Sequence, residues 1–478
     1  MFGFITLLSL FLIGKKHKNN TFGLVWVLLY FCSILPHFYF KSGIIDPVFN
    51  YFIFLSIYLF VEGTNQNKLS NLEKGKAVLH QLNKPKLFWF VFAGLSSAFA
   101  VLTKGPVGFL LFLLTVGVYF LVNRFKGFPN WRQSFLFLVA LLIPIVVWLG
   151  LDVLFNGFEK TIAFIQYQIE LFSKPVAGHQ QPFYYHFLVV LLGCFPMSFL
   201  ALPRLFKNPF SSEDYLAKWQ FILIFVVLIL FSIVSTKIVH YSSLAYLPLS
   251  YFAAQYCYEL HQSKSIKKWL SKSILVFGIV LGLLIALLPI VGIHKDFLIE
   301  LLKKDVLTAA SLKANVIWNG WEYLIGVFYA IIIVFAVYQL KQQKVLSGLK
   351  LFCLSTLFLL LSANLFIVPK IEQYSQGAAI SFYKNLQNRG VYVDTYGFKS
   401  YAHLYYANQM PKHHSNYRNK EWLLNGEIDK AVYLVSKANN TALDNHPNFE
   451  LIMVDGVFRF YKRKIANSPN SNIHYENK

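Results

Sequence analysis

The sequence predicts a mainly α-helical protein: a polytopic bundle of transmembrane helices followed by a small soluble α/β domain. Three observations predict this fold class. The 478 residues are 56% hydrophobic and only 14% charged, a composition typical of polytopic membrane proteins. Apolar runs recur along the chain, and their lengths are close to those of a helix that crosses a bilayer, about 20 residues. After residue 368 the apolar runs become shorter, and helix and strand signals alternate.

The membrane part, residues 1–368, is predicted to hold about eleven to twelve spans if a short first run is counted. Helices are expected because only helices and closed barrels satisfy the backbone within lipid. The eleven longer runs cover residues 22–40, 47–62, 87–103, 106–123, 134–155, 187–206, 219–235, 241–258, 273–293, 322–340 and 350–368. The first run, Phe2 to Gly14, is shorter than a span and its lysines follow it, which is the reverse of a signal peptide. We therefore expect it to be the inner half of a helix whose outer half is missing.

Basic loops predict the orientation of the bundle. Lysine and arginine gather in loops on alternate sides of successive spans, so the net charge of +22 indicates topology and contact with anionic lipid headgroups rather than nucleic-acid binding. By the positive-inside rule these loops face the cytoplasm. They are residues 15–18, 68–86, 124–132, 204–218, 264–272 and 341–350. The opposite loops and the carboxyl-terminal region are expected outside.

The carboxyl-terminal region is predicted to form a soluble α/β domain over residues 369–465, followed by a disordered tail at 466–478. Helices are expected near 374–387 and 401–407, and strands near 391–395, 431–435, 450–454 and 457–461. The chain contains no Gly-rich phosphate loop and no nucleotide fingerprint. Its four cysteines lie in apolar runs without metal-like spacing, so neither a disulfide framework nor a zinc finger is expected.

Two isolated charges at outer helix ends are candidate functional residues. Asp46 precedes a proline at the start of a span, where a carboxylate either caps the helix or serves a function. Lys104 interrupts two apolar runs in a Gly-Pro turn, where it is either a snorkelling lysine or a phosphate partner.

Polar and aromatic residues gather in two further segments of the same face. The loop from Phe155 to Phe187 holds an amphipathic stretch at 158–172, expected to be a helix either in the membrane interface or packed on the protein. His179, Gln181, Tyr184 and Tyr185 follow it. A lone loop histidine is usually solvated. A second group, Lys237, His240 and Tyr241, is either an interfacial anchor or part of a site.

One carboxylate, several cations and aromatic side chains on one face suit a substrate whose lipid tail stays in the membrane while its phosphate and head project from it. A sugar linked to a lipid phosphate is such a substrate. Phosphate is a good leaving group, so the reaction needs cations for the departing charge and a carboxylate for the proton of the acceptor hydroxyl.

Four ordered motifs resemble a known family. They are Ile45–Pro47, residues 102–108 (LTKGPVG), residues 178–185 (GHQQPFYY) with 193–196 (GCFP), and residues 235–241 (STKIVHY). In order and spacing they resemble the bacterial aminoarabinose transferase and related glycosyltransferases of the protein mannosyltransferase type, which have the GT-C fold. The resemblance implies an inner-membrane bundle with a periplasmic carboxyl-terminal domain. It further implies transfer of a sugar from a polyprenyl phosphate to a lipid or protein acceptor at the outer face.

The resemblance also assigns expected roles. Asp46 corresponds to a second acidic motif and is expected to assist catalysis. Lys104, His179, Lys237 and Tyr241 are expected to bind the substrate phosphate, with Val239 standing where the family has a proline. Gln181, Tyr184, Tyr185 and His240 are expected to line the substrate groove. His179 is also a candidate ligand for a divalent metal, although a zinc site needs three or four ligands.

Family members carry a first span and an outer acidic loop that supplies the main catalytic aspartate, and this sequence is expected to lack both at its amino terminus. Two alternatives therefore remain open. A lipid or solute transporter would show charges near the bilayer midplane and paired broken helices; Asp152 is the one midspan acid that bears on it. A noncatalytic membrane scaffold is favoured if the acidic loop is absent in the cell.

Overall fold

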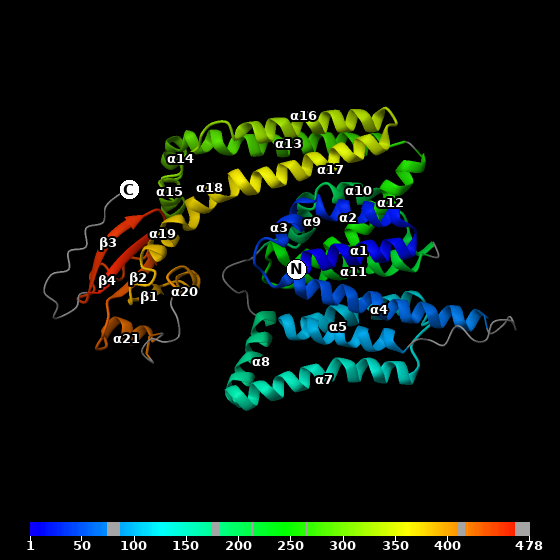
Figure 1. Cartoon of the computed structure of the whole chain (residues 1–478), viewed down its shortest axis with the longest axis horizontal. Coiled ribbons are helices and arrows are strands. Elements are labelled where there is room, and N and C mark those ends of the chain that lie inside the picture. Colours follow the sequence, from blue (N-terminus) through cyan, green and yellow to red (C-terminus); the bar gives the residue numbers. More distant parts are fainter. Residues whose placement is uncertain are drawn as a thin grey trace. The chain divides into compact units, whose positions relative to one another are not determined.

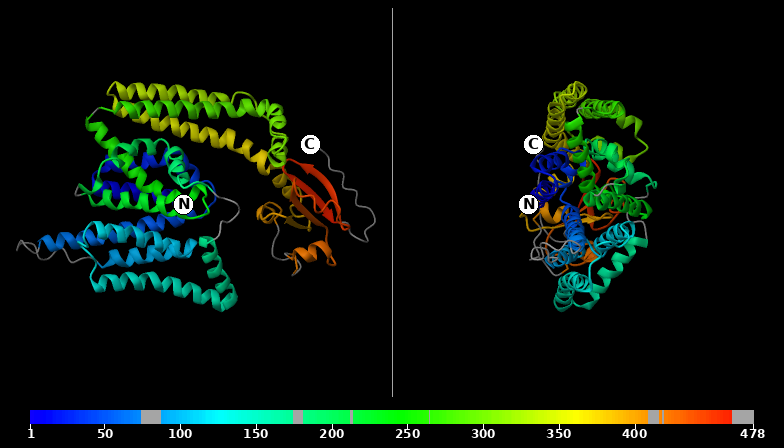
Figure 2. Two further views of the ribbon diagram at one scale, coloured as in Figure 1. Left: turned by 180° about the vertical axis from the view of Figure 1, so that it is seen from behind. Right: turned by 90° about the vertical axis from the view of Figure 1, so that its right-hand side faces the viewer.

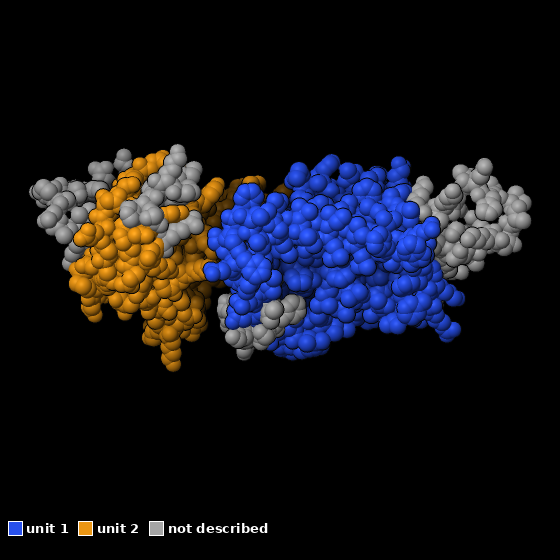
Figure 3. Space-filling view, turned by 90° about the horizontal axis from the view of Figure 1, so that it is seen from below, with its two compact units in different colours: residues 1–279, 331–360 blue, residues 280–330, 361–478 orange. Residues whose placement is uncertain are grey.

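The computed structural model describes residues 1–73, 87–173, 181–211, 214–263, 265–408, 416–417 and 419–463. The chain forms two compact units, coloured separately in Figure 3. Unit 1 comprises residues 1–279 and 331–360, and unit 2 comprises residues 280–330 and 361–478. Three helices, α13 (Lys268–Ile293), α16 (Tyr323–Lys341) and α17 (Val345–Ser362), contribute one end to each unit.

Unit 1 is a helical bundle, as predicted (Figure 1). Its further elements are α1 (Phe2–His17), α2 (Asn20–Phe31), α3 (Ile34–Tyr39), α4 (Asp46–Glu73), α5 (Phe88–Lys104), α6 (Val107–Val122), α7 (Trp131–Asn156), α8 (Phe158–Ser173), α9 (Tyr185–Gly193), α10 (Met197–Leu205), α11 (Tyr215–Ile233) and α12 (Tyr246–Ser263), with the 3₁₀ helices η1 (Pro209–Ser211) and η2 (Val239–Ala245). Every predicted apolar run in this unit lies on a helix or a pair of helices.

The apolar helices of the bundle differ in length and in straightness. Among the described residues, six helices are long and apolar enough to cross a membrane, or seven if the bent pair α9–α10 is one span. Three further apolar helices are shorter. The run at 187–206 bends by 117° between α9 and α10, where Pro196 cannot donate a backbone hydrogen bond. The run at 241–258 begins as the 3₁₀ helix η2 and becomes α-helical only two residues before Pro248.

Glycines allow neighbouring helices of unit 1 to approach closely. A Cβ on Gly14 of α1 would lie 2.8 Å from the Cα of Gly23 on α2, and a Cβ on Gly94 of α5 would lie 2.3 Å from the carbonyl oxygen of Phe137 on α7. Small residues at such contacts are typical of helices that associate in lipid, where close packing replaces the hydrophobic effect.

The two sets of loops lie at opposite ends of unit 1, as the predicted alternation requires. In Figures 1 and 2 the connections after α1, α6 and α10 lie together at one end, and the connections that precede α4 and follow α5, α7 and α11 lie together at the other. At the basic end, Lys16 donates to Glu62 over 2.5 Å, and Arg204 pairs with Glu259. Which end faces the cytoplasm stays a prediction.

Unit 2 contains the predicted α/β fold. Its strands are β1 (Tyr392–Tyr396), β2 (Val432–Lys437), β3 (Phe449–Asp455) and β4 (Phe458–Arg463), in the order β1-β2-β4-β3. β1 and β2 are parallel, and the other two neighbouring pairs are antiparallel. The helices are α14 (Lys295–Leu301), α15 (Val306–Leu312), α18 (Val368–Glu372), α19 (Ala378–Asn385), α20 (Ala402–Tyr406) and α21 (Lys420–Asn425), with π-helical turns at Ala363–Ile367 and Gln373–Gly377. The strands and helices predicted for this region are confirmed within a few residues.

The sheet of unit 2 is covered on both faces. On one face Phe382 of α19 packs against Phe460, with the ring centroids 4.4 Å apart and the ring planes tilted by 40°, within a cluster that includes Val435. On the other face Leu434 and Tyr461 pack with Leu423 of α21. Alternate residues of a strand point to opposite faces, so β2 feeds both clusters. The boundary predicted at 368/369 stays a prediction, since unit 2 also takes in residues 280–330, and the predicted tail at 466–478 lies outside the described residues.

Candidate functional site

A cavity of about 350 Å³ opens in unit 1, at the end where α4 begins and α5 ends. Most of its wall is apolar, with Phe49, Phe164 and Phe231 among the lining residues. Its polar groups include Asp46, Lys104 and Tyr241. The cavity therefore places a few polar groups within an apolar lining, the arrangement usual for small-molecule sites.

Local structure brings Asp46 and Lys104 to this end. Asp46 is the first residue of α4 and is followed by Pro47, so its carboxylate lies at the positive end of the helix dipole. Lys104 is the last residue of α5, where the dipole favours a cation. Gly105 has φ +99°, a backbone conformation open mainly to glycine, which turns the chain into α6.

Asp46 and Lys104 form an ion pair on the cavity wall. The Lys104 Nζ donates to Asp46 Oδ1 over 2.5 Å. The Asp46 side chain is only 6% exposed and that of Lys104 is 29% exposed. The ammonium also lies 5.0 Å from the ring centroid of Tyr241 and 5.7 Å from that of Phe49, a cation–π arrangement. The sequence-predicted residues Asp46, Lys104 and Tyr241 thus meet in one place.

His240 completes this cluster. Its Nε2 lies 3.9 Å from Asp46 Oδ2. Burial lowers the pKa of His240, and Lys104 lowers it further, which outweighs the opposite influence of Asp46. The imidazole is therefore neutral at pH 7, and it can accept or pass on a proton beside the carboxylate.

Asn50 is a buried cavity residue that the sequence analysis missed. Its Nδ2 donates to Tyr39 Oη over 2.6 Å and to Ser243 Oγ over 2.8 Å. These bonds tie α4 to α3 and η2, and so hold Asp46 and His240 in register. Asn50 lies one helical turn after Asp46 in an apolar helix, and that spacing was the signal available in the sequence.

Helix α8 lies across the ends of α5 and α7 at this end of unit 1, as Figure 1 shows. The helix predicted at 158–172 is confirmed, and its Phe164 and Tyr167 line the cavity. A second cavity of about 900 Å³ shares Phe164 with the first and is also lined by Asp152 and Lys160. Asp152 accepts hydrogen bonds from Asn156 Nδ2 and Thr161 Oγ1, each 2.8 Å long. Asp152 thereby holds α8 against the end of α7.

Among the described residues, the remaining predicted ones do not line the cavity that holds Asp46 and Lys104. Lys237 is buried and donates to the carbonyl of Val234, a cavity residue, over 3.0 Å. Gln181 and Tyr184 are exposed, and Tyr185 begins α9 half-buried. His179 lies outside the described residues. The roles expected for these residues stay predictions.

A metal at His179 also stays a prediction. Within the described ranges, no group of three or more His, Cys, Asp or Glu side chains is arranged to hold a metal ion. His186 was not predicted as a site residue, but it is fully buried and its ring centroid lies 6.2 Å from that of the cavity residue Phe231. It stands at the end of the polar loop, directly before an apolar run, where the sequence does not show that it is buried.

Residues 1–168, which contain Asp46, Lys104 and Asp152, match the family model described as dolichyl-phosphate-mannose-protein mannosyltransferase. The crystal structure of ArnT from Cupriavidus metallidurans bound to undecaprenyl phosphate matches with a TM-score of 0.70 and 14% identity, covering 98% of this chain and 84% of that one. The chain has the ArnT fold.

A second structure, ArnT from the same organism in the apo state, matches with a TM-score of 0.68 and 14% identity over 96% of this chain and 82% of that one. No curated protein sequence matches the chain significantly. The resemblance predicted from four short motifs, to ArnT-like and protein mannosyltransferase-type proteins of the GT-C fold, is thereby confirmed.

Proposed function

We propose that this protein is an integral-membrane glycosyltransferase. It moves a sugar from a polyprenyl-phosphate donor to a lipid or other envelope acceptor on the outer face of the membrane. The observation that carries the proposal is the Asp46–Lys104 pair on the wall of a largely apolar cavity. The matches to a mannosyltransferase family model and to an ArnT structure bound to undecaprenyl phosphate support it.

Lys104 is the proposed partner of the donor phosphate. Its ammonium is partly exposed and faces the cavity, so a phosphate that enters can compete with Asp46 for it. Charge-assisted hydrogen bonds to phosphate are strong. A cation held at this position stabilises the negative charge that develops on the leaving phosphate.

Asp46 is the proposed proton acceptor or orienting group. Once the phosphate draws Lys104 away, the carboxylate is free to accept the proton of the attacking hydroxyl. His240 is neutral at pH 7, and its Nε2 lies 3.9 Å from Asp46 Oδ2, so that proton can pass to it through one bridging water. The apolar wall, which includes Leu102, Leu111 and Leu230, suits the first isoprene units of the lipid.

Two substitutions test the chemistry. Asp46→Asn and His179→Ala are expected to abolish sugar transfer and leave membrane insertion intact, because each removes one functional group from an exterior helix end or loop. Loss of a general base costs about 100-fold or more. Sugar transfer is measured as the label that moves from a labelled polyprenyl-phosphate sugar to acceptors in an envelope extract. Turnover like that of wild type in both variants would remove the site assignment.

Donor binding can be tested without knowing the sugar. Undecaprenyl phosphate is expected to raise the unfolding temperature of the detergent-solubilised protein, and Lys104→Met is expected to reduce that rise. Lys16→Met is the matched control, because Lys16 also pairs with a buried carboxylate over 2.5 Å but at the other end of unit 1. An equal loss in both variants would contradict phosphate binding at Lys104.

The transporter alternative makes a different prediction. It expects paired broken helices in two halves of the chain, whereas within the described residues one helix pair, α9–α10, passes as a bent span. Binding of undecaprenyl phosphate without transfer to any envelope acceptor would favour transport or a scaffold role over catalysis.

A further inference from the structure

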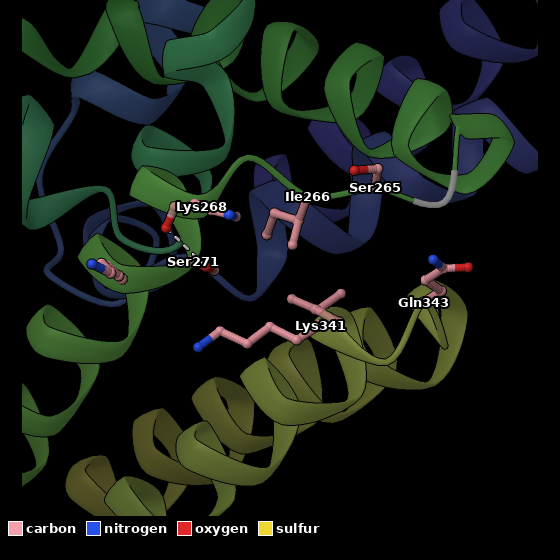
Figure 4. A pocket seen from close by; sticks show the side chains of 8 residues that line it. Ser265, Ile266, Lys268, Ser271, Lys341 and Gln343 are labelled. Atoms are coloured by element: carbon pink, nitrogen blue, oxygen red, sulfur yellow. Dashed lines mark hydrogen bonds between the residues drawn. The ribbon is translucent and has the colours of Figure 1, made fainter.

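We propose that unit 1 carries a second binding site, for the phosphate headgroup of an anionic phospholipid, at the end of the bundle away from Asp46. A cavity of about 430 Å³ lies there between the start of α13 and the end of α16 (Figure 4). The Asp46 cavity opens among the connections at the opposite end of unit 1 (Figure 1). The two sites are therefore separate.

The lining of this cavity is strongly basic. Lys268 and Lys272 are one turn apart on α13, and Lys341 is the last residue of α16. Figure 4 shows Lys268 and Lys341 on opposite sides of the cavity. None of the eight described lining residues is acidic, whereas Lys16 and Lys104 each bind a carboxylate. Three cations in a lining of this kind attract an anion from outside the chain.

The backbone and two polar side chains favour the same ligand. α13 begins at Lys268, so the positive end of its dipole and its first backbone N–H groups lie at the cavity. The hydroxyl of Ser265 and the amide of Gln343 also line it and can donate hydrogen bonds. Phosphate oxygens are the acceptors that such a set of donors suits.

Exposed apolar side chains lead away from the lysines along both helices. On α16, Ile331, Phe335 and Tyr338 are 59%, 50% and 54% exposed, and their spacing of four and three residues continues to Lys341 on one helix face. On α13, Val276 is 62% exposed and lies one turn after Lys272. Acyl chains can lie on these faces while the headgroup binds the lysines. These apolar faces place acyl chains next to the lysines, so a lipid headgroup is the phosphate nearest to the cavity.

A phospholipid with two phosphates, such as diphosphatidylglycerol, matches three lysines best in charge. Each lysine near an anionic lipid surface is expected to contribute about fivefold in affinity. Replacing all three is therefore expected to weaken binding roughly 100-fold. The bound lipid would bridge the segment before α13 and the turn after α16, so it should also stabilise the fold.

Native mass spectrometry of the full chain in detergent, titrated with diphosphatidylglycerol, measures this binding. The test variant is the triple Lys268→Gln, Lys272→Gln, Lys341→Gln. The control, Arg124→Gln, Lys126→Gln, Arg132→Gln, removes the same charge from the connection between α6 and α7 and the first turn of α7, which lie at the same end of unit 1 and do not line the cavity. We expect roughly 100-fold weaker lipid binding in the test variant and no more than a few-fold change in the control.

Three results would overturn the proposal: wild-type affinity in the test variant, an equal loss in the control, or pyrophosphate binding as tightly as the lipid. The last would indicate a site for a soluble anion. If the triple variant does not fold, Lys341→Gln alone, with Arg132→Gln as its control, is expected to weaken binding about fivefold. An unchanged affinity in Lys341→Gln would equally refute the site.

Discussion

Removing one partner of the Asp46–Lys104 pair should lower the free energy of unfolding by more than the loss of an exposed ion pair would. Lys104→Met would leave the Asp46 carboxylate, 6% exposed, without its cation. Breaking a fully buried pair costs about 3–5 kcal/mol. Lys104 is 29% exposed and His240 lies 3.9 Å from the carboxylate, so water and a second nitrogen offset part of that penalty. We expect a loss of about 2 kcal/mol.

The second pair of unit 1 provides the comparison. Glu62 is 5% exposed and its partner Lys16 is 50% exposed. When Lys16 is removed, Glu62 keeps a hydrogen bond of 2.7 Å from Tyr215 Oη. Lys16→Met should therefore cost less than Lys104→Met, about 1 kcal/mol or below.

A double-mutant cycle measures the coupling within the Asp46–Lys104 pair. Asp46→Asn, Lys104→Met and the double variant are unfolded in detergent micelles, and the free energies of unfolding are compared, with Lys16→Met measured alongside. Because the neutral amide introduced by Asp46→Asn needs no cation, the double variant should be more stable than the sum of the single losses indicates, with a coupling energy of about 1–2 kcal/mol. A coupling near zero, or a larger cost for Lys16→Met, would refute the assignment of Asp46–Lys104 as the more buried and interdependent pair.

Two other perturbations test the packing and the charges of unit 1. Burial raises the pKa of Asp214, but hydrogen bonds from His17 and from neighbouring groups outweigh it and hold the pKa at about 2. The ionised carboxylate should therefore stabilise the fold above pH 3.8, and this stabilisation should be lost as the pH falls toward 2. In Asp214→Asn the unfolding temperature should depend less on pH over that range. Gly94→Ala should destabilise the protein by about 1–3 kcal/mol because the new Cβ would meet the Phe137 carbonyl. Gly117 has open space around it, so Gly117→Ala should be neutral or slightly stabilising. Equal thermal stabilities of the two variants would contradict the close contact of α5 and α7.

Much of the fold was predictable because a membrane helix is determined by consecutive residues of the chain. A run of apolar residues must satisfy its backbone internally, so composition alone predicts a helix. The strands and helices of unit 2 were likewise visible in their periodicity. The predicted apolar runs all lie on helices, but a proline or a 3₁₀ turn changes helix geometry without interrupting an apolar run, so the bend at Pro196 and the 3₁₀ start of the run at 241–258 could not be predicted.

The candidate site was predictable only in part. Asp46 and Lys104 stood out because charges at the ends of apolar runs are rare and costly. Their contact could not be inferred from spacing, since 58 residues separate them. Asn50 was missed although it lies one turn after Asp46, and His186 was missed because a single histidine at the start of an apolar run is not informative without its neighbours in space.

The sequence by itself determined the helical membrane class, the alternation of basic loops, the α/β domain and the residues at which charge interrupts lipid-compatible runs, because these depend on neighbours along the chain. Only the tertiary structure decided which of those charges meet. The Asp46–Lys104 contact and the group of lysines between α13 and α16 arise where distant helix ends converge, and Coulomb interactions depend on distance in space rather than on separation in sequence.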